Sequence, residues 1–183
     1  MLQIRKNVFE TNSSSTHSLV ISNKERAYNY NLPVEGGVLT IPFGEFGWGP
    51  DLLTTPIEKL SYLITDRIDL YDIPEEIKDD DEAIQSLIRD SEPISEIIDA
   101  IKYCCPEVEE VRFELGDSWN PFGYVDHQSC GTSREEGLSI EEIAFSNKVI
   151  IMIANDNGYY YEEYFTDWQG NPPTKDIETL FND

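Results

Sequence analysis

The sequence has 183 residues, of which 39% are hydrophobic and 11% aromatic. This length and composition suit a single globular domain over residues 1–183 and exclude a mostly disordered chain. No apolar stretch approaches the roughly 20 residues that span a bilayer, and no apolar signal segment follows Arg5 and Lys6, so we expect a cytoplasmic protein that does not bind membranes.

The charge of the chain is strongly acidic and unevenly spread. The formal net charge is −23, from 36 acidic and 13 basic residues. Residues 72–118 hold 16 acidic and 4 basic side chains, a balance of −12, whereas residues 1–71 carry only −2. Such a surface repels nucleic acid and attracts basic partners, so we expect no direct binding to nucleic acid. The alternative is that the acidity only keeps the protein soluble.

The N-terminal third predicts three strands. Residues 2–9 and 17–22 are rich in β-branched and aromatic side chains, and TNSSST lies between them as the first six residues of the polar run 11–18. This connection is longer than a two-residue hairpin turn. Residues 37–41 predict a third strand, and PFGEFGWGP at 42–50 predicts a loop with three aromatic residues.

The first helix begins at Thr55. Thr55 can cap it, Pro56 suits the first helical position, and Glu58 completes a capping box. Apolar residues continue at helical spacing to Ile68, which predicts one face in the core.

Two further helices follow in the acidic part of the chain. The charged linker 73–82 supplies aspartates that can cap the second helix, whose apolar residues begin at Ile84. The third helix is expected over about 93–104 and ends at Pro106. We therefore expect a helical, acidic insertion over about 55–105, placed between strands.

The C-terminal part of the chain predicts strands again. Residues 108–115 predict a strand, followed by a long polar loop at 116–137. Ser139 and Glu142 form a second capping box.

The segment KVIIMIA at 148–154 is apolar on both faces and predicts a central strand. A turn at 155–158 and an aromatic strand at 158–165 complete a hairpin, and one or two helical turns are expected within 174–182. Strands before and after the helices predict an α+β fold with a mainly antiparallel sheet.

Two polar segments each contain one of the two histidines. A hydroxyl beside an imidazole is the minimum arrangement for a nucleophile activated by a general base. The candidate catalytic residues are Ser13, Ser14, Ser15, His17, Asp126 and His127. A serine-rich turn also has a purely conformational explanation, and neighbouring strand residues such as Asp126 and His127 point to opposite faces.

Metal binding has little support in the sequence. Two histidines and an aspartate could form a site if the strand ends converge, but their spacing does not require it. Cys104, Cys105 and Cys130 show no zinc-ligand spacing and are expected to be reduced thiols. We expect no metal and no cofactor.

Two motifs carry a resemblance to known proteins. FETNSSSTHS at 9–18 and GYVDHQS at 123–129 resemble motifs of a group of uncharacterised phage and prophage proteins. The resemblance implies a phage-type origin, a host-cytoplasmic setting and a single site that contains both histidine motifs. It implies no activity and no residue roles.

The sequence therefore leaves two main hypotheses. In the first, the chain binds and inhibits a basic host or defence protein, because spaced carboxylates imitate the phosphates of nucleic acid. The residues expected to contact this partner are Asp79, Asp80, Asp81, Glu82, Glu107, Glu109 and Glu110. In the second, it is a small enzyme or a nucleotide-binding protein with a site formed by residues 11–18 and 124–129. A structural component of a phage particle is a third possibility. The charge pattern involves far more of the chain than the histidine motifs and favours the first hypothesis.

Overall fold

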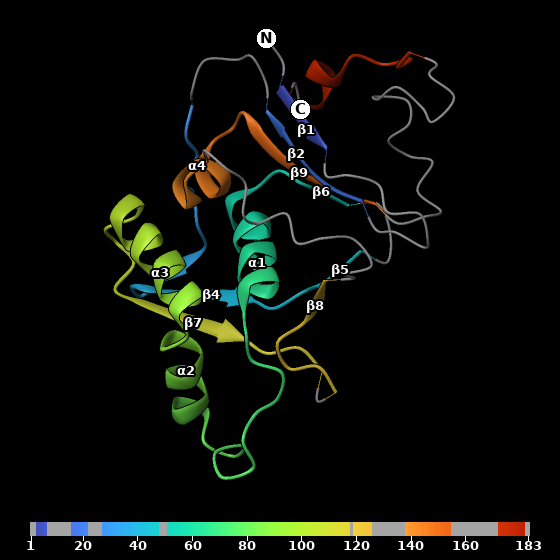
Figure 1. Ribbon diagram of the computed structural model, residues 1–183. Coiled ribbons are helices and arrows are strands. Elements are labelled where there is room, and N and C mark those ends of the chain that lie inside the picture. Colours follow the sequence, from blue (N-terminus) through green and yellow to red (C-terminus); the bar gives the residue numbers. More distant parts are fainter. Residues whose placement is uncertain are drawn as a thin grey trace.

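The computed structural model describes residues 3–6, 16–21, 27–47, 51–117, 119–125, 138–154 and 172–181 (Figure 1). The largest sheet in this part of the chain has four strands, all paired antiparallel. Their spatial order is β1 (Gln3–Lys6), β2 (Thr16–Ile21), β9 (Val149–Ala154) and β6 (Asp51–Leu53).

Strand β9 lies inside this sheet and is buried on both faces, which confirms the expectation of a central strand. Ile151 and Ile153 face the main core, whereas Ile150 and Met152 pack against Ile177. Ile177 begins the 3-10 helix η2 (Ile177–Phe181), the helical turn expected near the end of the chain. A strand covered on both faces needs apolar residues at successive positions, which explains the unbroken apolar run of β9.

Two smaller sheets contain parallel pairs. Strand β4 (Val38–Pro42) pairs antiparallel with β3 (Val34–Glu35) but parallel with β7 (Glu110–Glu114). Strands β5 (Glu45–Phe46) and β8 (Tyr124–Val125) also pair in parallel. The expectation of a mainly antiparallel sheet is therefore wrong, although the α+β class holds. Helices connect β4 to β7, and a crossover of this length permits parallel pairing.

The helices begin where the capping signals predict. Helix α1 (Pro56–Arg67) has a complete capping box, in which Glu58 Oε2 accepts from the Thr55 N–H at 2.9 Å. Helix α4 (Ile140–Phe145) has the second capping box, formed by Ser139 and Glu142. The remaining helices are α2 (Asp81–Arg89) and α3 (Glu92–Cys104).

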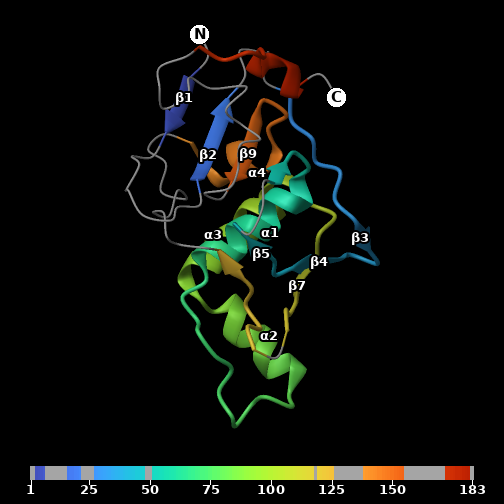
Figure 2. The same cartoon turned by 90° about the vertical axis from the view of Figure 1, so that its right-hand side faces the viewer.

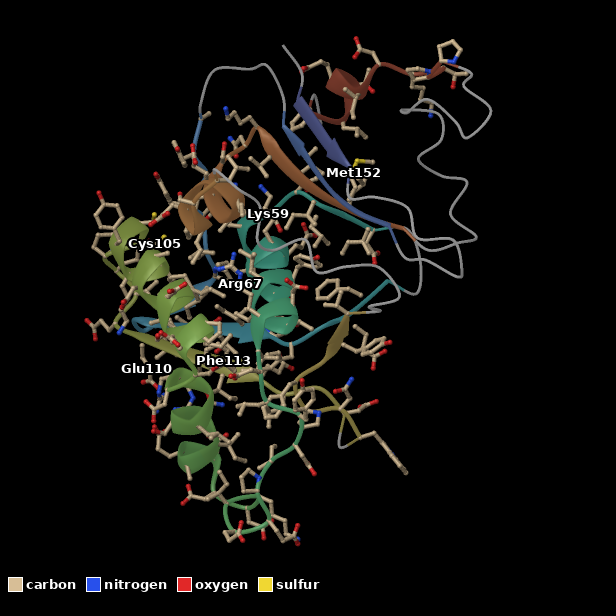
Figure 3. All side chains as sticks on the ribbon, viewed as in Figure 1. Lys59, Arg67, Cys105, Glu110, Phe113 and Met152 are labelled. Atoms are coloured by element: carbon tan, nitrogen blue, oxygen red, sulfur yellow. The ribbon has the colours of Figure 1, made fainter. Side chains whose placement is uncertain are left out.

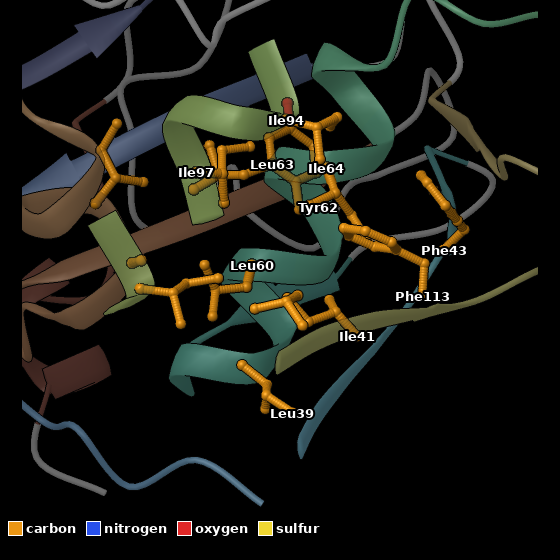
Figure 4. Close-up of a cluster of buried hydrophobic side chains, with 14 of the residues drawn as sticks. Leu39, Ile41, Phe43, Leu60, Tyr62, Leu63, Ile64, Ile94, Ile97 and Phe113 are labelled. Atoms are coloured by element: carbon orange, nitrogen blue, oxygen red, sulfur yellow. The ribbon is translucent and has the colours of Figure 1, made fainter. Parts of the chain in front are cut away.

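Helix α1 is the centre of the core. It packs against α3, α4, β4 and β8, and in both cartoon views it lies between the four-stranded sheet and the β4–β7 pair (Figures 1 and 2). Leu60, Leu63 and Ile64 are at most 1% exposed and meet side chains of α3 and β4 (Figure 4). The segment 55–105 lies between β6 and β7 in the chain, and its first helix organises the core around it.

A contact between two glycines aligns β5 with β8. Gly123 has a φ of 68°, and a Cβ atom at this position would lie 2.2 Å from the carbonyl oxygen of Gly44. That oxygen accepts the N–H of Tyr124 at 2.8 Å. The close approach leaves no room for a side chain at position 123.

The loop expected at 42–50 contains β5, and β6 follows directly after it. Both strands are too short to give a periodic signal. The expected aromatic hairpin at 155–165 lies outside the described residues, as does the part of the polar loop at 126–137.

Candidate functional site

Four of the seven predicted partner-binding acids lie at the start of α2. Asp80 is the N-cap, and its Oδ1 accepts the N–H of Ala83 at 3.1 Å. Asp81 and Glu82 occupy the first turn, where carboxylates interact favourably with the helix dipole. Asp79 is exposed just before the cap. The prediction that linker aspartates cap the second helix is confirmed.

The other three acids lie at the start of β7. Glu107 and Glu109 are exposed, and Glu110 is half-buried. The N–H of Glu109 donates to the Gly37 carbonyl oxygen at 2.8 Å, which fixes the backbone beside the β3–β4 turn. The seven acids at and just before the starts of α2 and β7 are called the acidic surface below: Asp79, Asp80, Asp81, Glu82, Glu107, Glu109 and Glu110.

Two arginines join the two parts of the acidic surface. Arg112 of β7 pairs with Asp81, with Glu82 at 3.2 Å and with Glu110 at 2.9 Å. Arg89 of α2 pairs with Glu82 at 2.5 Å and approaches Glu110 at 3.9 Å. Three carboxylates are thus shared by two guanidinium groups, so this cluster carries one net negative charge.

The ion pairs change the acid–base properties of the cluster. Hydrogen bonds from Arg89 and Arg112 lower the pKa of Glu82. Hydrogen bonds to Glu110 and Glu82 raise the pKa of Arg112. Both directions favour the charged forms of Glu82 and Arg112.

No sequence pattern singled out the two arginines or their neighbour Gln85. The side chain of Gln85 is 2% exposed and makes two hydrogen bonds to the backbone of Phe113, at 2.8 and 2.9 Å. The edge of β7 that faces away from β4 has no strand beside it among the described residues, and the Gln85 side chain makes the hydrogen bonds there that a neighbouring strand would make. The alternation of β7 does place Glu110 and Arg112 on one face, which is a signal that was available in the sequence.

The predicted histidine site cannot be assembled from the described residues. Ser13, Ser14, Ser15, Asp126 and His127 lie outside them. His17 lies in β2, where its backbone pairs with that of Ile153. The second motif begins in β8, whose residues Tyr124 and Val125 pair with β5. A shared site of the two motifs stays a prediction.

The thiols of the described residues are not set up for nucleophilic chemistry. Cys104 and Cys105 are free, and burial raises the pKa of Cys105 to about 11. Burial and the nearby carboxylate of Glu141 raise the pKa of Cys104 too. Both groups are therefore protonated at neutral pH, whereas a reactive cysteine needs the thiolate.

Lys59 is a buried cation that no sequence pattern singled out. Its side chain is 1% exposed, and its Nζ donates to the carbonyl oxygen of Ser146 at 3.0 Å, next to the end of α4 (Figure 3). Burial lowers the pKa of Lys59 to about 8, against the opposing effect of Glu58. A cation at a helix C-terminus is favourable, so Lys59 ties α1 to α4.

Within the described ranges, no three or more histidine, cysteine or acidic residues gather where they could hold a metal ion. No described helix is long and apolar enough to cross a membrane.

Comparisons with other proteins give no further assignment. No protein-family model matches the chain, and no curated protein or solved structure is significantly similar to it.

Proposed function

We propose that this chain is an acidic phage-type protein that binds and inhibits a basic, nucleic-acid-binding host or defence protein. The observation that carries the proposal is the exposure of Asp79, Glu107 and Glu109 on the acidic surface. Among the described residues, no lysine or arginine forms an ion pair with these three carboxylates. They are therefore available to cations of a partner.

The charge of the surrounding segment supports the same partner class. The net charge of −12 over residues 72–118 increases the association rate with a basic protein. It also lowers the affinity for nucleic acid. A nucleic-acid-binding protein has cationic sites that bind phosphates. Carboxylates at the start of a helix and the start of a strand can occupy these sites. The phage-type resemblance of the two histidine motifs supports a host protein as the target.

The test is retention of basic proteins from a bacterial lysate on the immobilised chain, at rising salt and with added DNA. We expect basic nucleic-acid-binding proteins at low salt, with release by salt because exposed charges are screened, and release by DNA because it competes for the same surface. The double variant Asp79→Asn/Glu109→Gln loses two charges of the acidic surface. At roughly 0.5 kcal/mol for each exposed charge, it should bind the captured protein about fivefold more weakly.

Two further variants make this test specific. Glu45→Gln/Asp51→Asn removes the same charge from exposed positions on β5 and β6 and serves as the matched control. Arg112→Gln removes the cation that neutralises part of the acidic surface, so it should tighten binding. Equal weakening by both double variants, or retention that salt does not reduce, contradicts the proposal.

A further inference from the structure

A second surface combines exposed aromatic rings with carboxylates. The rings of Tyr28 and Tyr30 are stacked, with centroids 5.8 Å apart and an interplanar angle of 2°. Tyr30 also packs on Phe145 at 5.4 Å, which fixes the stacked pair against α4. Despite these contacts, 43% of Tyr30 is exposed. Tyr30 thus contacts both Tyr28 and Phe145 and is still partly open to solvent.

Tyr103, near the end of α3, is within electrostatic range of Tyr30. Its side chain is 82% exposed. Desolvation raises the pKa of Tyr30, and the neighbouring Cys104, Tyr28, Cys105 and Tyr103 raise it further, so these groups are within electrostatic range of one another. The Sγ of Cys105 lies 3.9 Å from the Tyr30 carbonyl oxygen, which joins the end of α3 to the Tyr28–Tyr30 segment. Tyr28, Tyr30 and Tyr103 are called the tyrosine surface below.

Two carboxylates lie within electrostatic range of the two cysteines at the end of α3. Glu107 acts electrostatically on Cys105, and Glu141 acts on Cys104. Lys102 precedes Tyr103, but consecutive residues of a helix lie on different faces. The faces of tyrosine rings are negatively polarised, and the two carboxylates add to the negative potential.

We infer that the tyrosine surface binds an arginine side chain of the basic partner protein. A guanidinium group is planar, stacks on aromatic rings and pairs with carboxylates at its edge, whereas a lysine ammonium is a compact and strongly hydrated charge. Tyrosine and arginine are both enriched where protein interfaces have their strongest contacts. The inference rests on the proposed function and adds to it that arginine, rather than basic charge alone, is recognised.

The experiment compares two short peptides in calorimetric titrations of the full chain. One alternates arginine with glycine, and the other has lysine in place of every arginine, so the two have the same charge. A cation–π contact at an exposed site predicts that the arginine peptide binds about threefold to fivefold more tightly. The variant Tyr30→Leu/Tyr103→Leu should bind both peptides equally. The control Tyr71→Leu changes a side chain that is 95% exposed in another acidic segment and should keep the preference.

Each outcome separates the two proposals. Leucine keeps the apolar contact of position 30 with Phe145, and Tyr103 is largely exposed, so the double variant should fold. The single variant Tyr103→Leu should already reduce the preference for arginine.

Equal binding of both peptides to the unmodified chain overturns the inference and leaves the proposed function standing. A preference that survives the double variant, or that Tyr71→Leu also removes, overturns it too. If neither peptide binds at low salt, both proposals fail.

Discussion

At the scale of single residues, Lys59 is the side chain with the most unusual environment. An isolated buried ammonium costs far more than an exposed one, and a single carbonyl oxygen offsets only part of this cost. The lowered pKa of Lys59, about 8, expresses the same balance, because the folded state favours the neutral amine. Lys59 therefore couples the stability of the fold to pH.

This coupling predicts a rise in stability with pH. Between about pH 8 and 10.5, the unfolded chain holds a proton on Lys59 that the folded chain has released, so the free energy of unfolding increases as the pH rises. Below about pH 8 both states are protonated, and the full penalty of the buried charge is present. The shift corresponds to at most about 3 kcal/mol.

Urea denaturation at pH 7 and pH 10 measures the effect, with Lys59→Met as the reference. Other groups titrate in this range as well, and subtracting the variant removes their contribution. From pH 7 to pH 10, we expect the unfolding free energy of the natural chain to increase relative to that of the variant. Parallel pH profiles of the two proteins would show that the lysine is not desolvated.

At the scale of elements, α2 protects the edge of β7. The two hydrogen bonds of Gln85 satisfy the N–H and C=O of Phe113, and Arg112 and Arg89 hold the outer side of the same contact. An unpaired strand edge is a template for association with other chains. The acidic surface and the protected edge therefore depend on the same helix–strand contact.

Replacing Gln85 by leucine should destabilise the protein by about 2–4 kcal/mol. The leucine side chain fills a similar volume, but two buried backbone groups of Phe113 lose their partners, each at a cost of about 1–3 kcal/mol. Urea denaturation followed by circular dichroism measures the loss. Ser86→Ala, at an exposed neighbouring position of the same helix, should change stability by less than about 0.5 kcal/mol. Similar losses in both variants would contradict the role of Gln85.

The sequence predicts elements best where the signal is local. The capping boxes at Thr55 and Ser139 and the N-cap at Asp80 depend on residues three apart, and all three are present. Contacts across the chain have no such signal. Arg112 meets Asp81 31 residues away, and Gln85 meets Phe113 28 residues away, because parallel pairing with β4 places β7 beside α2.

The candidate site was predictable to a similar degree. Charge alone identified the segment that carries the acidic surface, since acid density needs no knowledge of contacts. It could not show which carboxylates are neutralised, because Glu82 and Glu110 share their cations across two elements. Nor did it indicate the tyrosine surface, whose members come from two distant segments that meet where the Cys105 Sγ approaches the Tyr30 carbonyl oxygen.

At the scale of the whole molecule, a net charge of −23 on 183 residues opposes compaction. The ion pairs around Arg112 relieve the repulsion between α2 and β7. Like charges that are closer in the folded than in the unfolded chain destabilise the folded state, and salt screens them. The stability of the protein should therefore depend on ionic strength.

We expect the urea midpoint to rise when sodium chloride increases from about 0.02 M to about 0.5 M, as the screening length falls from roughly 20 Å to roughly 4 Å. The same change should weaken binding to a basic partner, so salt acts on stability and binding in opposite directions. The less acidic variant Asp79→Asn/Glu109→Gln should show a smaller rise. A midpoint that falls with salt would mean that the ion pairs of Arg89 and Arg112 outweigh the overall repulsion.

The contact between Gly44 and Gly123 has a consequence for how this sequence can change. A methyl group on Gly123 would overlap the backbone of Gly44, and one on Gly44 would lie 2.7 Å from the ring of Phe46. The substitution at Gly123 would push β5 and β8 apart, and the one at Gly44 would displace the buried ring of Phe46. Among variants selected only for folding, these two positions should stay glycine together, while the almost fully exposed Trp119 nearby in the chain is free to vary. If Trp119 proved equally invariant in such a selection, its side chain would have a role in stability that its exposure does not suggest.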